Sequence, residues 1–282
     1  MPSPATTLTL VTDAAEAKAG LAGLIESDPA ALSVVASVID GLVADPTRYT
    51  GPRWWLGSDR AGEVVAAFMH TPPHPLHVAV ATEQSARALA ARLAADGDNL
   101  QGVGGMRRPA EAFADEWVGR TGVGSRVSME IGSFDLPVAP HVPFEVSGRH
   151  RRATSGDREL VDGWNRAFVE AIEGGGRTPP SLAQAVADGR VALWEDEGGP
   201  VSMAYASPAN GGITRISGVW TPPELRGHGY ASGVVAALSR ERQDLGDRCM
   251  LYTDLANPTS NAIYVAMGYR RVGDAVHIAF SA

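Results

Sequence analysis

The sequence contains one cysteine, Cys249, in 282 residues, so it can form neither an intramolecular disulfide nor a zinc site built from cysteines. Positive charge is also scarce, since 24 Lys and Arg stand against 32 Asp and Glu, a formal net charge of -8. Nucleic-acid binders carry a basic patch or stripe, so this balance disfavours that class and favours cationic small partners. The seven histidines form no H-x-x-x-H or H-E-x-x-H pattern, and we therefore expect no metal.

Long apolar runs are missing as well. No run approaches the length of a membrane span, and the opening residues, MPSPATTLTL, lack the basic and apolar regions of a signal peptide. We therefore expect a cytoplasmic protein without a membrane partner. Hydrophobic residues make up 44% of the chain and charged residues 20%, a globular composition that excludes wholesale disorder.

The length suggests two domains, because single domains usually have about 100–200 residues. The proline-rich stretch Asp135–Pro143 (DLPVAPHVP) shows no periodicity and is the best linker candidate. We therefore predict domains at 1–137 and 138–282. Helical and strand patterns occur on both sides of the linker, so the expected fold class is α/β or α+β with helices flanking a mixed sheet. Strands are expected at 7–11, 53–56, 63–70, 76–80, 100–105, 126–134, 144–152, 191–194, 201–207, 213–220, 249–253 and 270–280, and helices within 13–45 and at 83–95, 109–118, 157–172, 182–188, 230–244 and 260–267.

The two halves show a weak internal repeat. Pro109 and Gly119 bracket a predicted helix in the first half, and Pro258 and Gly268 bracket another at the same spacing in the second. The order of elements before these helices is similar, which suggests two copies of one fold.

The clearest motif lies in the second half. The stretch from Val219 to Ala231 (VWTPPELRGHGYA) leads from a strand into an apolar helix. Glycine lets backbone N–H groups approach a ligand closely, and a helix N-terminus attracts anions. The stretch therefore predicts a cradle for a diphosphate. His228 has two about equally good interpretations: it contacts the phosphate, or it is a loop residue that faces the solvent.

This loop has three other interpretations. A Walker A loop needs Gly-Lys-Ser/Thr, which is absent. A dinucleotide fingerprint is closer, because Gly227, Gly229 and Ser232 approximate G-x-G-x-x-G and Asp254 follows at a strand end. However, six residues separate the strand from the first glycine, which disfavours it. A glycine-rich turn that merely caps a helix is the third alternative.

A second motif follows close behind. The stretch from Leu251 to Tyr269 (LYTDLANPTSNAIYVAMGY) predicts a strand, a polar turn and a short helix ending at Gly-Tyr. Asn261 and Tyr264 are three residues apart and share a helix face. An amide there can bond a pantetheine arm or a phosphate, and a tyrosine can donate a proton to a leaving thiolate. Alternatively, Asn257 caps the helix and Tyr264 is core.

Together the two motifs resemble the GNAT superfamily of N-acetyltransferases, and more closely a bacterial subgroup with two domains. Arg226-x-x-Gly229-x-Ala231 is similar to the acyl-CoA loop of that superfamily, and Asn257 to Tyr269 is similar to its last helix. The resemblance covers about residues 144–282. It implies acetyl-CoA as co-substrate and Tyr264 as the catalytic general acid. It also implies cofactor binding by Val219, Trp220, Thr221, Arg226, Gly227, His228, Gly229, Tyr230, Ala231, Asn257 and Asn261.

The first half departs from this pattern. It has Ala81-Thr-Glu-Gln-Ser-Ala where the second half has the glycine loop, and the Pro/Gly bracket places Asp115 where the second half has Tyr264. The first half is therefore interpreted as a degenerate GNAT-like domain, which would shape the acceptor cleft or replace a dimer partner. The acidic residues that could activate an amine, for which solvated surface is the better interpretation, are Glu170, Glu173, Glu195 and Asp196.

The sequence thus predicts an acetyltransferase that acts on an amine, with a small molecule as the first expectation. A non-catalytic acyl-CoA-binding module is the alternative, and a dinucleotide oxidoreductase is disfavoured. The acceptor and the choice between monomer and homodimer stay open.

Overall fold

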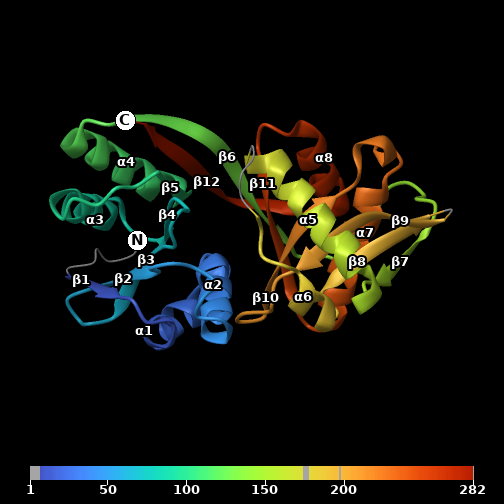
Figure 1. Cartoon of the computed structure of the whole chain (residues 1–282), viewed down its shortest axis with the longest axis horizontal. Coiled ribbons are helices and arrows are strands. Elements are labelled where there is room, and N and C mark those ends of the chain that lie inside the picture. Colours follow the sequence, from blue (N-terminus) through green and yellow to red (C-terminus); the bar gives the residue numbers. More distant parts are fainter. Residues whose placement is uncertain (1–6, 174–177, 197, 282) are drawn as a thin grey trace. The chain divides into compact units, whose positions relative to one another are not determined.

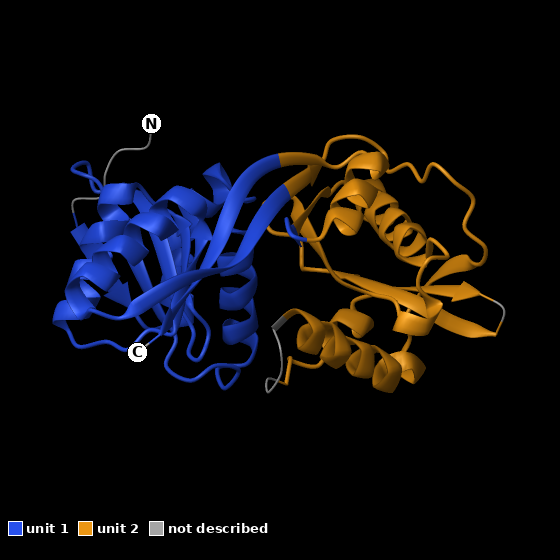
Figure 2. Ribbon diagram, turned by 90° about the horizontal axis from the view of Figure 1, so that it is seen from above, with its two compact units in different colours: residues 1–133, 253–256, 272–282 blue, residues 134–252, 257–271 orange. Residues whose placement is uncertain are grey.

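A computed structural model describes residues 7–173, 178–196 and 198–281 of the chain (Figure 1). The chain divides into two compact units (Figure 2). Unit 1 consists of Met1–Ser133, Thr253–Ala256 and Val272–Ala282, and unit 2 of Phe134–Tyr252 and Asn257–Arg271. Both units are therefore discontinuous in sequence.

Unit 1 has a mixed sheet with a helix pair on each face. Trp54 and Trp55 are successive strand residues, so they point to opposite faces and enter different cores. α1 (Ala14–Ser27) and α2 (Ser33–Ala44) cover one face, and α3 (Glu83–Ala95) and α4 (Arg107–Thr121) cover the other. The strand order is β1 (Thr7–Val11), β2 (Arg53–Ser58), β3 (Val64–His70), β4 (Leu76–Val80), β5 (Gly102–Met106), β12 (Arg270–Ser281) and β6 (Gly124–Leu136), with β4 and β5 parallel.

Unit 2 has the same layers. Its strands follow the order β11 (Arg248–Asp254), β10 (Ile213–Trp220), β9 (Gly199–Ala206), β8 (Val191–Asp196) and β7 (Arg149–Arg152), with β10 and β11 parallel. α5 (Arg158–Glu173) and α6 (Ala183–Ala187) pack on one face. α7 (Tyr230–Asp244) and α8 (Pro258–Met267) pack on the other, over a core in which Cys249 is fully buried. Cys249 is therefore a core residue, as expected. Its burial raises the pKa of the thiol to about 12.

The same series of elements occurs twice along the chain: a strand, two helices, three strands, a helix, a strand, a helix and a strand. The predicted α/β class and the predicted repetition of one arrangement of elements are therefore confirmed. The Pro/Gly bracket is wrong for the first half, because Gly119 lies inside α4 and the left-handed Gly122 ends that helix. Asp115 lies seven residues before the glycine that ends its helix, whereas Tyr264 lies four before Gly268, so the two positions do not correspond. The exposed carboxylate of Asp115 lies 3.6 Å from the Arg87 guanidinium.

The expected strand at 144–152 is also wrong in its first half, since β7 begins only at Arg149. The preceding residues lie on α7 instead of in the sheet. The Trp194 indole donates a hydrogen bond to the carbonyl of Ser147 at 2.7 Å, and this fixes where the chain leaves α7. The glycine- and proline-rich sequence of 173–180 (EGGGRTPP) predicts a flexible break, and its residues 174–177 lie outside the described residues.

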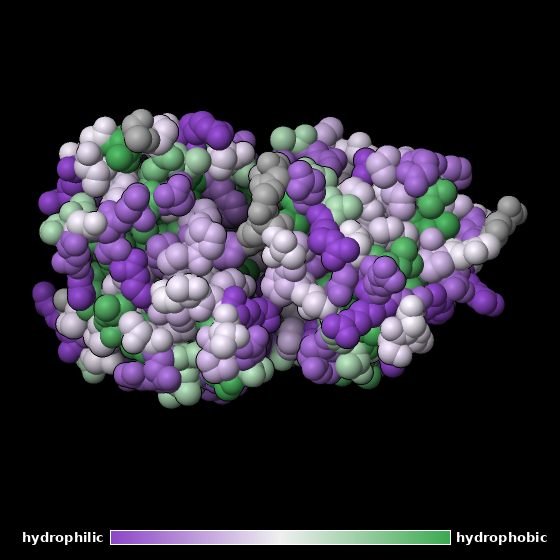
Figure 3. Space-filling model, viewed as in Figure 1, coloured by the Kyte–Doolittle hydropathy of each residue, from purple (hydrophilic) through white to green (hydrophobic). Residues whose placement is uncertain are grey.

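The face seen in Figure 3 is mainly hydrophilic with scattered apolar side chains, as is common for globular proteins. Among the described residues, no helix combines the length and the apolar character that a membrane crossing requires.

One half-buried ion-pair network fixes the start of α5. Arg151 of β7 makes two 2.7 Å bonds to Asp157 and one of 2.5 Å to Glu195. Asp157 also accepts a hydrogen bond from the Thr154 N–H at 2.8 Å, which closes a capping box. Chiefly through the Arg151 hydrogen bonds, this network holds the pKa of Asp157 well below its usual range.

We predict that Asp157→Asn lowers the free energy of unfolding by about 1–2 kcal/mol at pH 7, the usual worth of a helix cap. Because the native pKa of Asp157 is lowered, its contribution is present above the unfolded pKa of about 4 and declines as the pH falls. Urea unfolding at pH 7 and pH 3 measures this, with the exposed Glu159→Gln in the same helical turn as control. An equal loss at both pH values would contradict it.

Candidate functional site

The site is built where two parallel strands part. β10 and β11 pair only at Ile213–Arg215 with Arg248–Met250, so the rest of each strand diverges from the other. On its other side β10 stays attached to β9 through Ile216, Ser217 and Trp220. The edge of β10 that faces β11 is therefore open for another extended chain to pair with.

A bulge lies in this open part of β10. The register with β9 shifts between Ser217 and Trp220, and Gly218 between them has φ of +58°. A Cβ on Gly218 would lie 2.2 Å from the Tyr205 ring, so only glycine fits here. The bulge turns Val219 towards the core under α7 and α8, and Trp220 towards the core under α5 and α6.

The end of β10 is fixed by buried polar contacts. The hydroxyl of the fully buried Ser202 lies 2.9 Å from the Thr221 hydroxyl and donates to the Trp220 carbonyl at 3.0 Å. Arg226 folds back and donates its Nε–H to the Thr221 carbonyl at 3.0 Å. Its guanidinium carbon also lies 5.2 Å from the centroid of the Trp220 ring. Arg226 thus closes the loop onto the strand.

Two left-handed glycines complete the loop. Gly227 has φ of +85° and Gly229, the N-cap of α7, has φ of +80°. The first backbone bond of α7 runs from the Gly233 N–H to the Gly229 carbonyl, so the N–H groups before it have no acceptor within the helix. Among the described residues, no side chain caps this helix start. The open loop and the helix dipole together suit an anion.

The residues around the glycines are held in place by their side chains. The ring of His228 stacks on that of Tyr230 at a centroid distance of 5.4 Å, and His228 is exposed. The buried Tyr230 donates its hydroxyl to Asp196 of β8, which also accepts from Ser147 at 2.7 Å. Asp196, expected to be solvated surface, instead anchors the loop. Ala231 follows in the first turn of α7.

The corresponding region of unit 1 is closed. The start of α3 is capped by Thr82, which accepts a hydrogen bond from the Ser85 N–H at 3.2 Å. Where β4 meets β5, a Cβ on Gly105 would lie 2.0 Å from the Val78 carbonyl oxygen, so the two backbones are in close contact. Unit 1 therefore has no uncapped helix start at this position. Its strand β4 continues for only two residues beyond the pairing with β5, whereas β10 continues for five residues beyond the pairing with β11.

The second motif lies on α8, which packs on the same core as α7. Asn257 is the N-cap and accepts a hydrogen bond from the Ser260 N–H at 3.0 Å, while Asn261 lies one turn further on. Tyr264 is half-buried against the core under α7, with its ring 5.9 Å from and nearly perpendicular to the ring of Tyr269. Burial raises the pKa of the Tyr264 phenol to about 12. The Tyr269 hydroxyl lies 2.8 Å from that of Ser239.

The structure thus places every predicted site residue in unit 2, on β10, the glycine loop, the start of α7, and α8 with its N-cap. Their function as cofactor ligands stays a prediction. Sequence reasoning missed Gly218 and misjudged Asp196. An isolated glycine within a strand pattern is a bulge signal that could have revealed Gly218. The exposed Glu170 agrees with solvated surface, whereas Glu195 belongs to the Arg151 network, and the Glu173 side chain is outside the described residues.

Comparisons with known proteins agree with this picture. Residues 198–278 match the family model of FR47-like proteins. No curated protein sequence matches the chain. Solved structures that match include an acetyltransferase from the GNAT family of Colwellia psychrerythraea, with 9% identity, coverage of 98% of this chain and 99% of the other, and a TM-score of 0.59. A GCN5-related N-acetyltransferase from Sphaerobacter thermophilus has 16% identity, coverage of 99% and 97%, and a TM-score of 0.63. Another from Kribbella flavida has 17% identity, coverage of 76% and 86%, and a TM-score of 0.55.

At sequence identities of 9–17%, a similar structure is evidence for the fold alone. The fold predicted from the two motifs is confirmed, because two of these structures match over nearly the whole of both chains.

The glycine geometry yields a stability prediction. Gly227→Ala should lower the free energy of unfolding by about 1–2 kcal/mol, since alanine is disfavoured at positive φ and no neighbour lies within 4 Å. Gly229→Ala should lower it further, because its Cβ would lie 2.6 Å from the Phe144 ring. Urea unfolding measures both losses.

Two controls accompany this pair. Gly163→Ala within α5 meets only ordinary contacts and should stabilise slightly. The second control combines Gly229→Ala with Phe144→Ala, which removes the steric overlap. Measured against Phe144→Ala alone, the loss of unfolding free energy caused by Gly229→Ala should then approach that of Gly227→Ala. Equal losses for the two single variants would show that Phe144 exerts no constraint on Gly229.

Proposed function

We propose that this chain, which has the fold of the GNAT superfamily, is an acyl-CoA-dependent N-acyltransferase whose active site lies in unit 2. Acetyl-CoA is the proposed acyl donor and an amine, with a small molecule as the first expectation, is the acceptor. The observation that carries the proposal is the combination of a parted β10–β11 pair with an uncapped, glycine-led helix start directly after β10. The residues present therefore fit a ligand with an extended amide-bearing arm and a diphosphate.

Each part of the site has a proposed task. The exposed edge of β10 around Val219 to Thr221 would pair with the amide groups of the pantetheine arm, as a strand would. The backbone N–H groups from Arg226 to Ala231 would bind the pyrophosphate. Arg226 and Tyr230 support this loop through their contacts to Thr221 and Asp196, so their side chains act mainly by positioning it. Asn257 caps α8, and Asn261 is proposed to contact the pantetheine arm.

Acyl transfer to an amine forms a C–N bond and breaks a C–S bond, while the amine loses one proton and the sulfur gains one. Tyr264 is proposed to supply the proton to the sulfur. Its raised pKa keeps it protonated at neutral pH. The same burial that disfavours its phenolate also disfavours a thiolate beside it, so the proton transfer is more nearly balanced than the pKa values in water suggest.

The amine must be neutral to attack, so its proton has to leave before the C–N bond forms. β10 carries no carboxylate. Removal of the proton through water is therefore proposed in place of a direct carboxylate base. The net charge of -8 favours the approach of an ammonium ion from solution.

A non-catalytic acyl-CoA-binding module is the second candidate. The capping of α8 by Asn257 and the packing of Tyr264 are compatible with it, since both residues also serve the fold. Catalysis separates the two candidates. Release of free CoA from acetyl-CoA in the presence of an amine panel, with the panel omitted as control, supports the enzyme, whereas binding without amine-dependent release supports the module.

The variant Tyr264→Phe tests the general acid. Turnover should fall by roughly 10²–10⁴, the usual contribution of a positioned proton donor. Affinity for acetyl-CoA and the Tm should change little, because the ring packing is kept. Initial rates under saturating acetyl-CoA measure the effect.

Tyr269→Phe is the matched control, since it removes a phenol hydroxyl from the same core. Without the Tyr269 hydroxyl, the buried Ser239 hydroxyl loses its hydrogen-bond partner. The free energy of unfolding should therefore fall by about 1–3 kcal/mol, and turnover should stay nearly unchanged. If Tyr264→Phe behaved like Tyr269→Phe, Tyr264 would be a core residue and the proposed acid would be wrong.

A further inference from the structure

The proline-rich segment 138–147 does not hang free but lies along α7. The Arg240 guanidinium donates to the Pro140 carbonyl at 2.8 Å, and the Gln243 amide donates to the Val138 carbonyl at 3.0 Å. Towards α8, the His141 N–H donates to the Met267 carbonyl at 3.0 Å. At its far end the Ser147 hydroxyl bonds to Asp196, the residue that also anchors Tyr230. We call residues 138–147 the strap.

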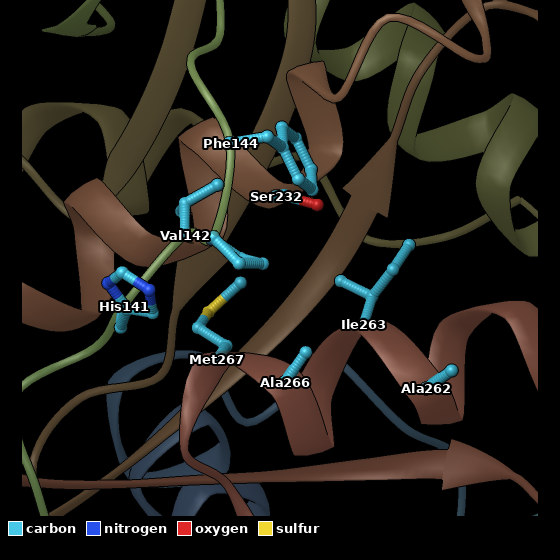
Figure 4. A pocket seen from close by; sticks show the side chains of 9 residues that line it. His141, Val142, Phe144, Ser232, Ala262, Ile263, Ala266 and Met267 are labelled. Atoms are coloured by element: carbon cyan, nitrogen blue, oxygen red, sulfur yellow. The ribbon is translucent and has the colours of Figure 1, made fainter.

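The strap roofs a pocket of about 200 Å³ between α7 and α8 (Figure 4). Val142 and Phe144 of the strap lie on one side of it, and Ile263 and Met267 of α8 lie on the other. Ser232 of α7 and His141 of the strap are the lining residues with polar side chains, and the other seven lining residues are apolar. Such a space disfavours a charged group and favours a neutral ring with few polar atoms to satisfy, for which Ser232 and His141 can serve as partners.

The pocket adjoins the glycine loop. Ser232 is the third residue of α7, three positions after Gly229, and the Phe144 ring is the group that a Cβ on Gly229 would strike. A molecule whose pyrophosphate lay on the loop could therefore place its next group in the pocket. Pockets for drug-sized ligands measure about 300–1,000 Å³, so this one suits a single flat ring system.

We propose that this pocket receives the adenine ring of the acyl-CoA and that Phe144 of the strap stacks on it. The proposal rests on the proposed function, because acyl-CoA is the ligand that joins a pyrophosphate to an adenine. Phe144 is 50% exposed, so one part of its ring is available to a ligand. The strap is thus a specificity element that distinguishes the complete cofactor from a shorter pantetheine thioester.

The test compares two acyl donors by calorimetry on the full chain: acetyl-CoA and S-acetyl-4′-phosphopantetheine. The second lacks the 3′-phosphoadenosine and one phosphate of the diphosphate, so each variant is compared with the wild type for the same ligand. Ala266→Phe places a ring into the pocket from an exposed position on α8. Val265→Phe, at the neighbouring position with 59% exposure and outside the pocket, is the matched control. Phe144→Ala removes the stacking partner.

We expect Ala266→Phe and Phe144→Ala to weaken acetyl-CoA binding by about tenfold or more, since stacking a base on an aromatic ring is worth about 1–3 kcal/mol. Binding of the phosphopantetheine thioester should stay within about twofold, and Val265→Phe should change neither ligand. An unchanged affinity for acetyl-CoA in both pocket variants would overturn the proposal. Equal weakening of both ligands, at an unchanged Tm, would assign the pocket to the pantetheine arm and overturn it too. If the wild-type chain bound neither ligand, the proposed function itself would fall.

Discussion

The candidate site depends on a single constraint, the early end of the pairing between β10 and β11. Only three residues of each strand are joined, and beyond Arg215 the two backbones separate. This separation opens the β10 edge, and the Gly218 bulge then directs Val219 and Trp220 to opposite faces. Because α7 follows β10 directly through the glycine loop, the open edge and the uncapped helix start lie in series along one path. A linear ligand with amides followed by a diphosphate matches that order.

The two units show how small local differences separate a candidate site from a closed one. Both units have the same order of elements and the same helix pairs on the two faces. In unit 1 a threonine hydroxyl accepts the bond of a helix N–H, and β4 ends two residues after its pairing with β5. In unit 2 glycine takes the place of the capping side chain. A cap stabilises a helix by about 1 kcal/mol, so its absence at α7 is consistent with a ligand serving that purpose.

Much of this could be predicted from local sequence. The short apolar run around Trp54 and Trp55 and the helical pattern of α7 could be predicted, because both depend on the spacing of neighbouring residues. The motif around Gly227 and Gly229 identified the loop for the same reason, since only glycine adopts that backbone readily. What failed depends on distant partners. The strap has residues that could form a strand, but its position is set by Trp194, Arg240 and Gln243, which lie about 50–100 residues away. Asp196 was misjudged likewise, because its partner Tyr230 lies on another element.

Backbone amides of unit 2, and none of unit 1, are proposed to hold the acyl donor. Amide hydrogen exchange with and without acetyl-CoA measures this most directly. The account predicts slower exchange for peptides that cover residues 219–232 and no change for peptides that cover residues 81–86. Protection at 81–86, or no protection at 219–232 under saturating acetyl-CoA, would contradict it.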